Sequence, residues 1–108
     1  MEEHFNKIEK EILKNGLKKT FAGGLEQVIN EMTSFFMTNR RGISIQEKVI
    51  LIIKCNESKE ITMDDIGLIS DTIQDGMYNK ASIIMHIDDE PFSENNGFEL
   101  SLYYLLEE

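Results

Sequence analysis

The stretch Glu47-Lys48-Val49-Ile50-Leu51-Ile52-Ile53-Lys54 decides the fold. Its five central residues are all aliphatic, and charged residues close the run at both ends. A membrane-spanning helix needs about 20 apolar residues, so this run is too short to cross a bilayer. An unbroken apolar run of this length is typical of a strand that is apolar on both faces. The sequence therefore predicts a strand over about 45–55 whose two faces must both be covered.

The composition favours one small folded domain. The chain has 108 residues, 41% of them hydrophobic, and a single proline. This length suits one compact domain and is short for two. We therefore expect a single domain over 1–108, with an N-terminal helix within 1–16 and an α+β core over 17–108.

The net charge and the N-terminal sequence limit the classes of partner and the cellular location that we expect. The chain carries 20 acidic and 11 basic residues, a net charge of −9, which repels a nucleic-acid backbone. The start, Met1-Glu2-Glu3, lacks the basic flank and apolar core of a signal peptide, and no stretch reaches transmembrane length. We expect a cytoplasmic protein that binds neither nucleic acid nor a membrane.

The residues before the central strand predict two helices and a short strand. A first helical stripe is formed by Phe5, Ile8, Ile12 and Leu13, and Asn15-Gly16 offers a left-handed stop after it. A short edge strand follows over 17–21, with a flexible glycine turn behind it. The clearest helical period in the chain then predicts a helix that packs on the sheet, at Leu25, Val28, Ile29, Met32, Phe35 and Phe36.

The residues after the central strand predict a helix and two further strands. Thr62-Met63-Asp64-Asp65 resembles a capping box, so a helix should begin there, and Gly76 is an end signal. The buried stripe of this helix is expected at Ile66, Ile69, Ile73 and Met77. Residues 81–87 are apolar enough for a central strand, and 98–106 alternate with a period of two. The last two strands are expected to form a hairpin.

These elements together define a fold class. The strand, helix and strand over 45–87 leave enough chain for a parallel crossover, after which the last strand returns antiparallel. We predict an α+β fold: a mixed three- to four-stranded sheet with two main helices on one face, plus the N-terminal helix.

One face of this sheet lacks an obvious cover. Side chains alternate across a strand, so if Val49, Leu51 and Ile53 face the two main helices, Ile50 and Ile52 face the other way. The N-terminal helix covers only part of that face. Soluble monomers rarely expose such a patch, so we expect Ile50 and Ile52 to bind a partner or a second copy of the chain.

The chain shows no motif that predicts a catalytic, metal or cofactor site. His4 and His86 are the only histidines, and Cys55 is the only cysteine, which rules out an intrachain disulfide. The Gly23-Gly24 pair lacks the spacing of a phosphate-binding loop, and Asp88-Asp89-Glu90 reads as an acidic turn. We therefore expect no cofactor and no enzymatic activity.

Four short segments resemble the C-terminal domain of FtsZ, the bacterial relative of tubulin, in order and spacing. Val49-Ile50-Leu51-Ile52-Ile53 resembles a G-V-L-x-N-I-like strand, and Ile61-Thr62-Met63-Asp64-Asp65-Ile66 a helix start of the form L-x-L-x-E-hydrophobic. The stretch 81–90 is similar to A-x-I-I-x-G-x-x-I-D-D, and 98–105 to the closing strand E-x-R-V-T-V-I-A. The resemblance covers about His4 to Leu106.

The chain departs from that family at its nucleotide chemistry. The family's GTP-binding domain, with its G-G-G-T-G-T-G loop, has no counterpart here, so the resemblance does not imply GTP binding. The family's loop that reaches the neighbouring subunit reads roughly D-F-A-D-V, and its acids position the water that attacks GTP. His4-Phe5-Asn6-Lys7-Ile8 matches it, with His4 and Lys7 in place of both acids. The resemblance implies partner contacts at His4, Phe5 and Lys7 without catalysis.

Two functional hypotheses follow. The first is a non-catalytic interaction module that forms homo-oligomers or binds and regulates a tubulin-like filament protein. The second is a small oligomeric enzyme with sites between subunits, as in the Bacillus-type chorismate mutase, whose topology is related. The second hypothesis expects a pocket lined by Arg40, Arg41 or His86.

Overall fold

The computed structural model describes residues 6–39, 48–55, 61–77, 80–88 and 97–106. Three helices and four strands lie in these ranges. In chain order they are α1 (Lys7–Asn15), β1 (Leu17–Gly23), α2 (Leu25–Asn39), β2 (Lys48–Cys55), α3 (Met63–Gly76), β3 (Ser82–Asp88) and β4 (Phe98–Tyr104).

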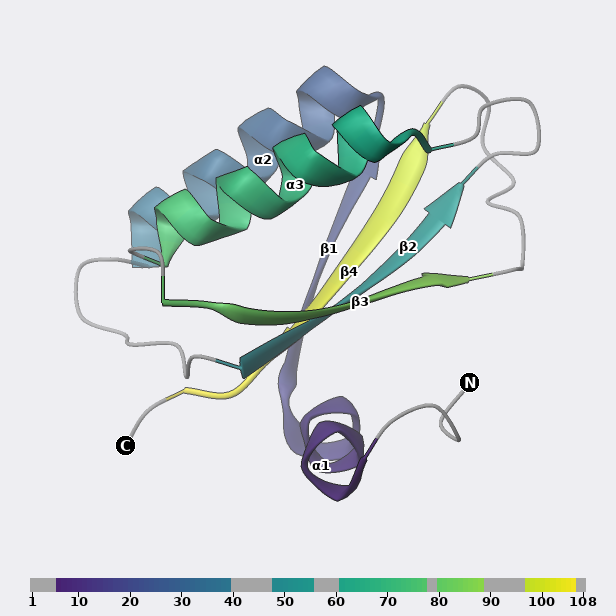
Figure 1. Cartoon of the computed structure of the whole chain (residues 1–108). Coiled ribbons are helices and arrows are strands. Elements are labelled where there is room, and N and C mark those ends of the chain that lie inside the picture. The colour runs from purple at the N-terminus through teal and green to yellow at the C-terminus, as the bar shows by residue number, and fades with distance from the viewer. Residues whose placement is uncertain (1–5, 40–47, 56–60, 78–79, 89–96, 107–108) are drawn as a thin grey trace.

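The strands form one mixed sheet in the order β1-β4-β2-β3. β2 and β3 are parallel, whereas β4 runs antiparallel to both of its neighbours, β2 and β1. Helices α2 and α3 cover one face of the sheet, and α1 lies against the other (Figure 1). The predicted α+β class, the parallel crossover from β2 to β3 and the placing of two main helices on one face are confirmed.

The positions expected for the last two strands are wrong. β3 lies at an edge of the sheet, and β4 forms no hairpin with it but inserts between β1 and β2. β4 is buried on both faces, with Leu100 0% and Ser101 5% exposed. β3 is apolar because helices reach it on both sides: Ile83 packs in the cluster under α2 and α3, and Ile84 in the cluster with α1. The apolar run therefore indicated that both faces of the strand are covered. It did not indicate that the strand lies in the centre of the sheet.

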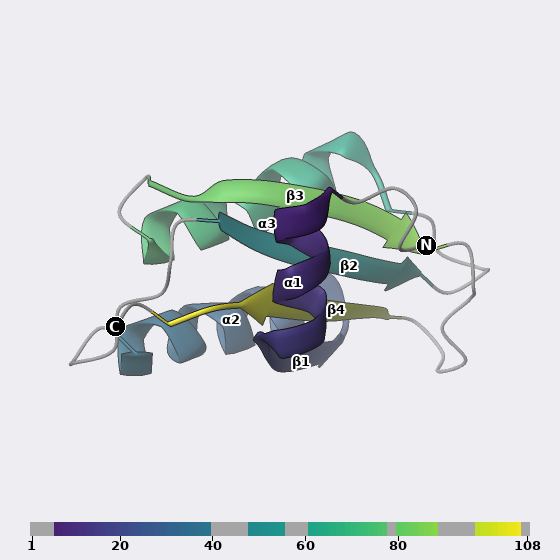
Figure 2. The ribbon, with the colours of Figure 1, turned by 90° about the horizontal axis from the view of Figure 1, so that it is seen from below.

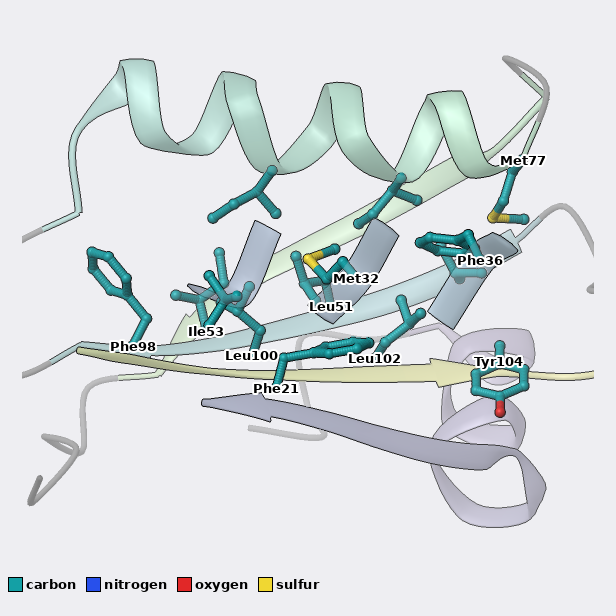
Figure 3. Packing of buried hydrophobic residues seen from close by; sticks show 14 residues of the cluster. Phe21, Met32, Phe36, Leu51, Ile53, Met77, Phe98, Leu100, Leu102 and Tyr104 are labelled. Atoms are coloured by element: carbon teal, nitrogen blue, oxygen red, sulfur yellow. The ribbon is translucent and has the colours of Figure 1, made fainter. Parts of the chain in front are cut away.

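The main core lies between the sheet and the two long helices (Figure 3). From the strands it takes the residues of one pleat, such as Leu51, Ile53 and Leu100, which are fully buried. From the helices it takes the predicted stripes: Val28, Met32, Phe36, Ile69, Ile73 and Met77 are all buried. The expected capping box of α3 is also present, because Asp65 N donates to Thr62 Oγ1 at 3.1 Å and Thr62 N donates back to the Asp65 carboxylate.

Two glycines permit close approaches on this side of the molecule. Gly23 ends β1 with φ of +135°, a conformation that L side chains rarely adopt, and the chain turns there into α2. Gly76 ends α3, as predicted, but a Cβ there would overlap the Phe36 ring. The glycine is thus needed for the packing of α3 on α2 as well as for the end of the helix.

Candidate functional site

α1 begins with a reciprocal cap. Glu9 N donates to Asn6 Oδ1 at 2.9 Å, and Asn6 N donates to Glu9 Oε1 at 3.1 Å. This capping box fixes the first helical residue at Lys7, so the helix starts later than the sequence suggested. His4 and Phe5, two of the predicted partner contacts, lie outside the described residues.

α1 crosses the strands of the sheet on the face opposite α2 and α3 (Figure 2). Its Ile12 is 1% exposed and forms a small second core with Ile50 and Ile52, which are 0% and 5% exposed. The expectation that Ile50 and Ile52 lie on a bare surface is therefore wrong. A single short helix is sufficient because it lies across the strands and contacts several of them at once, instead of covering one along its length.

A salt bridge fixes α1 to β2. Lys48 Nζ lies 2.9 Å from Glu9 Oε2, and the whole Glu9 residue is only 7% exposed. The ammonium group of Lys48, followed by the backbone N–H of Asn6, holds the pKa of Glu9 below its usual value of 4.5. Glu9 thus takes a buried position beside Ile12 that the apolar pattern had not assigned to it.

The end of α1 is fixed by a glycine. Gly16 has φ of −75°, so the expected left-handed stop is wrong. A Cβ at Gly16 would lie 2.8 Å from the backbone oxygen of Tyr104 and would also overlap the Ile12 carbonyl. Gly16 is therefore needed because the chain passes close to β4 at this point.

The first turn of α1 exposes an aliphatic side chain. Ile8, which the sequence placed in the buried stripe, is 62% exposed, and Lys7 beside it is also exposed. The helix rests on the sheet through Glu9, Ile12 and Leu13, and Ile8 lies on the flank of that face. Of the predicted partner contacts, Lys7 is the one that is both described and accessible. Lys7 and the exposed Ile8 beside it, which was not among those contacts, are here called the α1 tip.

The rest of this sheet face is polar. The strand register places Ala22, Glu99, Lys54 and Asp88 in one row across the four strands, on the same pleat as Ile50 and Ile52. Thr20 and Ser101 occupy the next row, beside Ile52. The apolar part of the face is therefore confined to the area that α1 covers.

The residues considered for chemistry do not meet. His86 is half-buried on the α1 face, in register with Ile52, whereas Cys55 belongs to the opposite pleat and packs against the main core. Arg40 and Arg41 lie outside the described residues. The hollow between β1 and α2 and the hollow between α2 and α3, both formed by described residues, do not have His86 in their lining. Among the described residues, no three histidine, cysteine or acidic side chains gather as metal ligands would.

No model of a known protein family matches the chain, and no curated protein matches it. Within the described ranges, the helices are too short or too polar to cross a membrane.

Proposed function

We propose that this chain is a non-catalytic protein-interaction module that resembles the C-terminal half of FtsZ. It binds and regulates a tubulin-like filament protein, or a second copy of itself, through the α1 tip. The observation that carries the proposal is Ile8, an aliphatic side chain left 62% exposed in the first turn of a helix that is fixed to the sheet.

The way α1 is held supports this proposal. Ile12 is buried, Lys48 pairs with Glu9, and Gly16 lets the helix end pass close to β4. Ile8 therefore occupies a defined position before any partner arrives. A preorganised contact loses less conformational entropy on binding, so even a small apolar side chain contributes to affinity.

We infer the class of partner from the resemblance to FtsZ. His4-Phe5-Asn6-Lys7-Ile8 matches the family's loop that reaches the neighbouring subunit, and the α1 tip is the described end of that stretch. Lys7 replaces an acid that positions the attacking water in the family. A module that takes this contact without the acid would occupy the filament end and leave GTP unhydrolysed at that interface.

Sedimentation with filaments tests the proposal. Filaments of an FtsZ-type protein, assembled with GTP, are pelleted with the full chain, and GTP hydrolysis is measured in parallel. We expect the chain to pellet with the filaments and to lower the GTPase rate. Ile8→Asp should abolish both effects, since it places a charge in the contact.

Met63→Asp is the matched control, because Met63 is 81% exposed at the start of α3, on the other side of the sheet. It should leave both effects intact. Light scattering distinguishes the two partners. A wild-type dimer that becomes a monomer in Ile8→Asp would mean that the α1 tip binds a second copy of the chain. A monomeric chain that neither pellets nor alters GTP hydrolysis contradicts the proposal.

A further inference from the structure

A second accessible surface lies at the β1 edge of the sheet. Within the described residues β1 has one strand neighbour, β4, and α2 runs above it on the helix face. Between β1 and α2 lies a groove of about 470 Å³, called here the edge groove. Its β1 wall includes Lys19 and Phe21, and its α2 wall includes Asn30, Glu31, Ser34, Phe35 and Thr38.

The geometry of the edge groove suits an extended chain. An edge strand presents backbone N–H and C=O groups on its outer side, where a further strand can pair with them. Extended peptides bind in this way when a groove beside the edge also accepts their side chains. The volume of the edge groove lies within the range of about 300–1,000 Å³ that is usual for ligand sites.

The floor of the edge groove is a rigid aromatic surface. Phe35 is half-buried, and its ring meets the rings of Phe21 and Tyr104 edge-on, at 5.8 and 5.6 Å between centroids. These neighbours fix the orientation of Phe35. Its accessible part therefore offers an apolar contact for one aliphatic side chain of a ligand.

The walls of the edge groove are polar, with a positive charge on the β1 side and a negative charge on the α2 side. Asn30, Ser34 and Thr38 are exposed at intervals of four residues along one side of α2, so an amide and two hydroxyls line the groove. Lys19 is exposed on the β1 wall, on the same pleat as Phe21. Lys18 and Lys19 make the β1 side positively charged, whereas Glu31 lines the groove from α2, so an acidic group is attracted to the β1 side.

We propose that the edge groove binds an extended acidic segment of another protein, which adds a strand beside β1. An aliphatic side chain of that segment rests on Phe35, and a carboxylate two residues away meets Lys19. A second copy of this chain is the less suitable occupant. Two-fold pairing of β1 with itself would place four lysines, Lys18 and Lys19 of each copy, on one short pair of strands, and each copy carries −9.

This proposal does not rest on the filament role of the α1 tip. The edge groove lies on the helix face of β1, whereas α1 covers part of the opposite face. Ile8→Asp should therefore leave binding in the edge groove unchanged, so failure of one proposal is distinguishable from failure of the other.

Peptide selection on the intact chain provides the probe. Random linear peptides displayed on phage are selected against the immobilised protein, and the enriched peptides are synthesised with a fluorophore for polarisation measurements. We expect enriched sequences in which an acidic residue lies two positions from an aliphatic one, so that both face the groove. Bound peptide should also slow hydrogen–deuterium exchange of the β1 amides, because a new strand pairs with the outer edge.

Two matched pairs of variants locate the binding surface. Ser34→Trp, which fills the groove without adding a charge, should weaken binding about tenfold or more, whereas Thr33→Trp, exposed on the same helix and outside the groove lining, should not. Lys19→Glu should weaken binding by a similar factor, and Lys18→Glu, on the other pleat, by less than about threefold. Circular dichroism confirms that each variant is folded.

Three results would each overturn the proposal. One is a selection that enriches no acidic peptide. Another is binding that survives both Ser34→Trp and Lys19→Glu. The last is bound peptide that leaves exchange in β1 unchanged.

Discussion

The two faces of the sheet are covered in different ways. On the face under α2 and α3, fourteen buried residues form one continuous core. On the α1 face the buried hydrophobic cluster of the described residues consists of Ile12, Ile50 and Ile52. Yet Leu51 and Ile50, neighbours in the same strand, are equally inaccessible at 0% exposure. Burial of a single residue therefore does not show how much structure depends on it.

The difference lies in what surrounds the buried residues. The helix face is apolar along β2 and β4 and needs two long helices, whereas the α1 face is apolar where α1 crosses and mostly polar beyond it. α1 is accordingly fixed by a few specific contacts, among them the Lys48–Glu9 ion pair. We expect the helix face to determine global stability and the α1 face to determine local opening.

Cavity-forming substitutions on the two faces test this contrast, with the largest effect expected at Leu51. Leu51→Ala should lower the free energy of unfolding by about 3–5 kcal/mol, because it leaves a void inside a closely packed core. Ile12→Ala should cost less, about 2–3 kcal/mol, since α1 can detach while the rest remains folded. Urea denaturation measures both values.

Hydrogen exchange separates the two mechanisms. In Ile12→Ala the amides of 7–15 should exchange faster while those of β2 and β4 keep their protection. Loss of protection across all four strands in Ile12→Ala would show that α1 belongs to the same cooperative unit as the main core.

Glycines on α3 supply a second, smaller test of the helix face. Gly76→Ala should destabilise the protein by about 1–3 kcal/mol, because the added methyl group would overlap the Phe36 ring. Gly67→Ala is the matched control in the same helix, where an added Cβ meets nothing within 4 Å. It should stabilise the protein by about 0.5–1 kcal/mol through better helix propensity.

A double variant tests whether the Phe36 ring is the group that Gly76 contacts. Phe36→Leu combined with Gly76→Ala should cost less than the sum of the two single changes, because the smaller side chain makes room for the methyl group. Thermal unfolding of the four proteins measures this coupling. Strictly additive costs would contradict the close approach of α2 and α3.

Much of the helix face was predictable from the sequence because it depends on periodicity. The stripe through Val28, Met32 and Phe36 and the alternation through Phe98, Leu100 and Leu102 each identify an element and its buried side. The capping box at Thr62 likewise depends on neighbouring residues only. Such features are predictable because the residues that form the pattern are themselves close together in the chain.

The α1 face was less predictable because it depends on contacts between distant residues. Ile8 fits the apolar stripe but is exposed. Glu9 is buried and forms an ion pair with Lys48, which lies 39 positions further along the chain. Nothing local marks Gly16 as the point where the chain passes Tyr104. The edge groove escaped prediction for the same reason, because it exists only once β1 lies beneath α2.

The smallest expected effect is the response of the α1 face to acid. The folded chain holds the pKa of Glu9 below 4.5, so folding favours its ionised form. This contribution to stability is complete above 4.5 and is lost as the pH falls through the lowered pKa of the folded state. Glu9→Gln removes the charge but keeps the cap, because glutamine also accepts the Asn6 N–H. The variant should be less stable than the wild type near neutral pH, and the two urea midpoints should converge in acid.

A residue of the helix face, Tyr104, supplies the control for this measurement because it titrates at alkaline pH. Burial raises the pKa of Tyr104 above 10.0, so its contribution is present below pH 10 and is lost as the pH rises through the folded value. Tyr104→Phe should therefore change the alkaline limb of the stability profile and leave the acid limb as in the wild type. Glu9→Gln should do the reverse. If the difference between Glu9→Gln and the wild type stayed constant from neutral pH into acid, the Lys48–Glu9 pair would not be what holds α1 against the sheet.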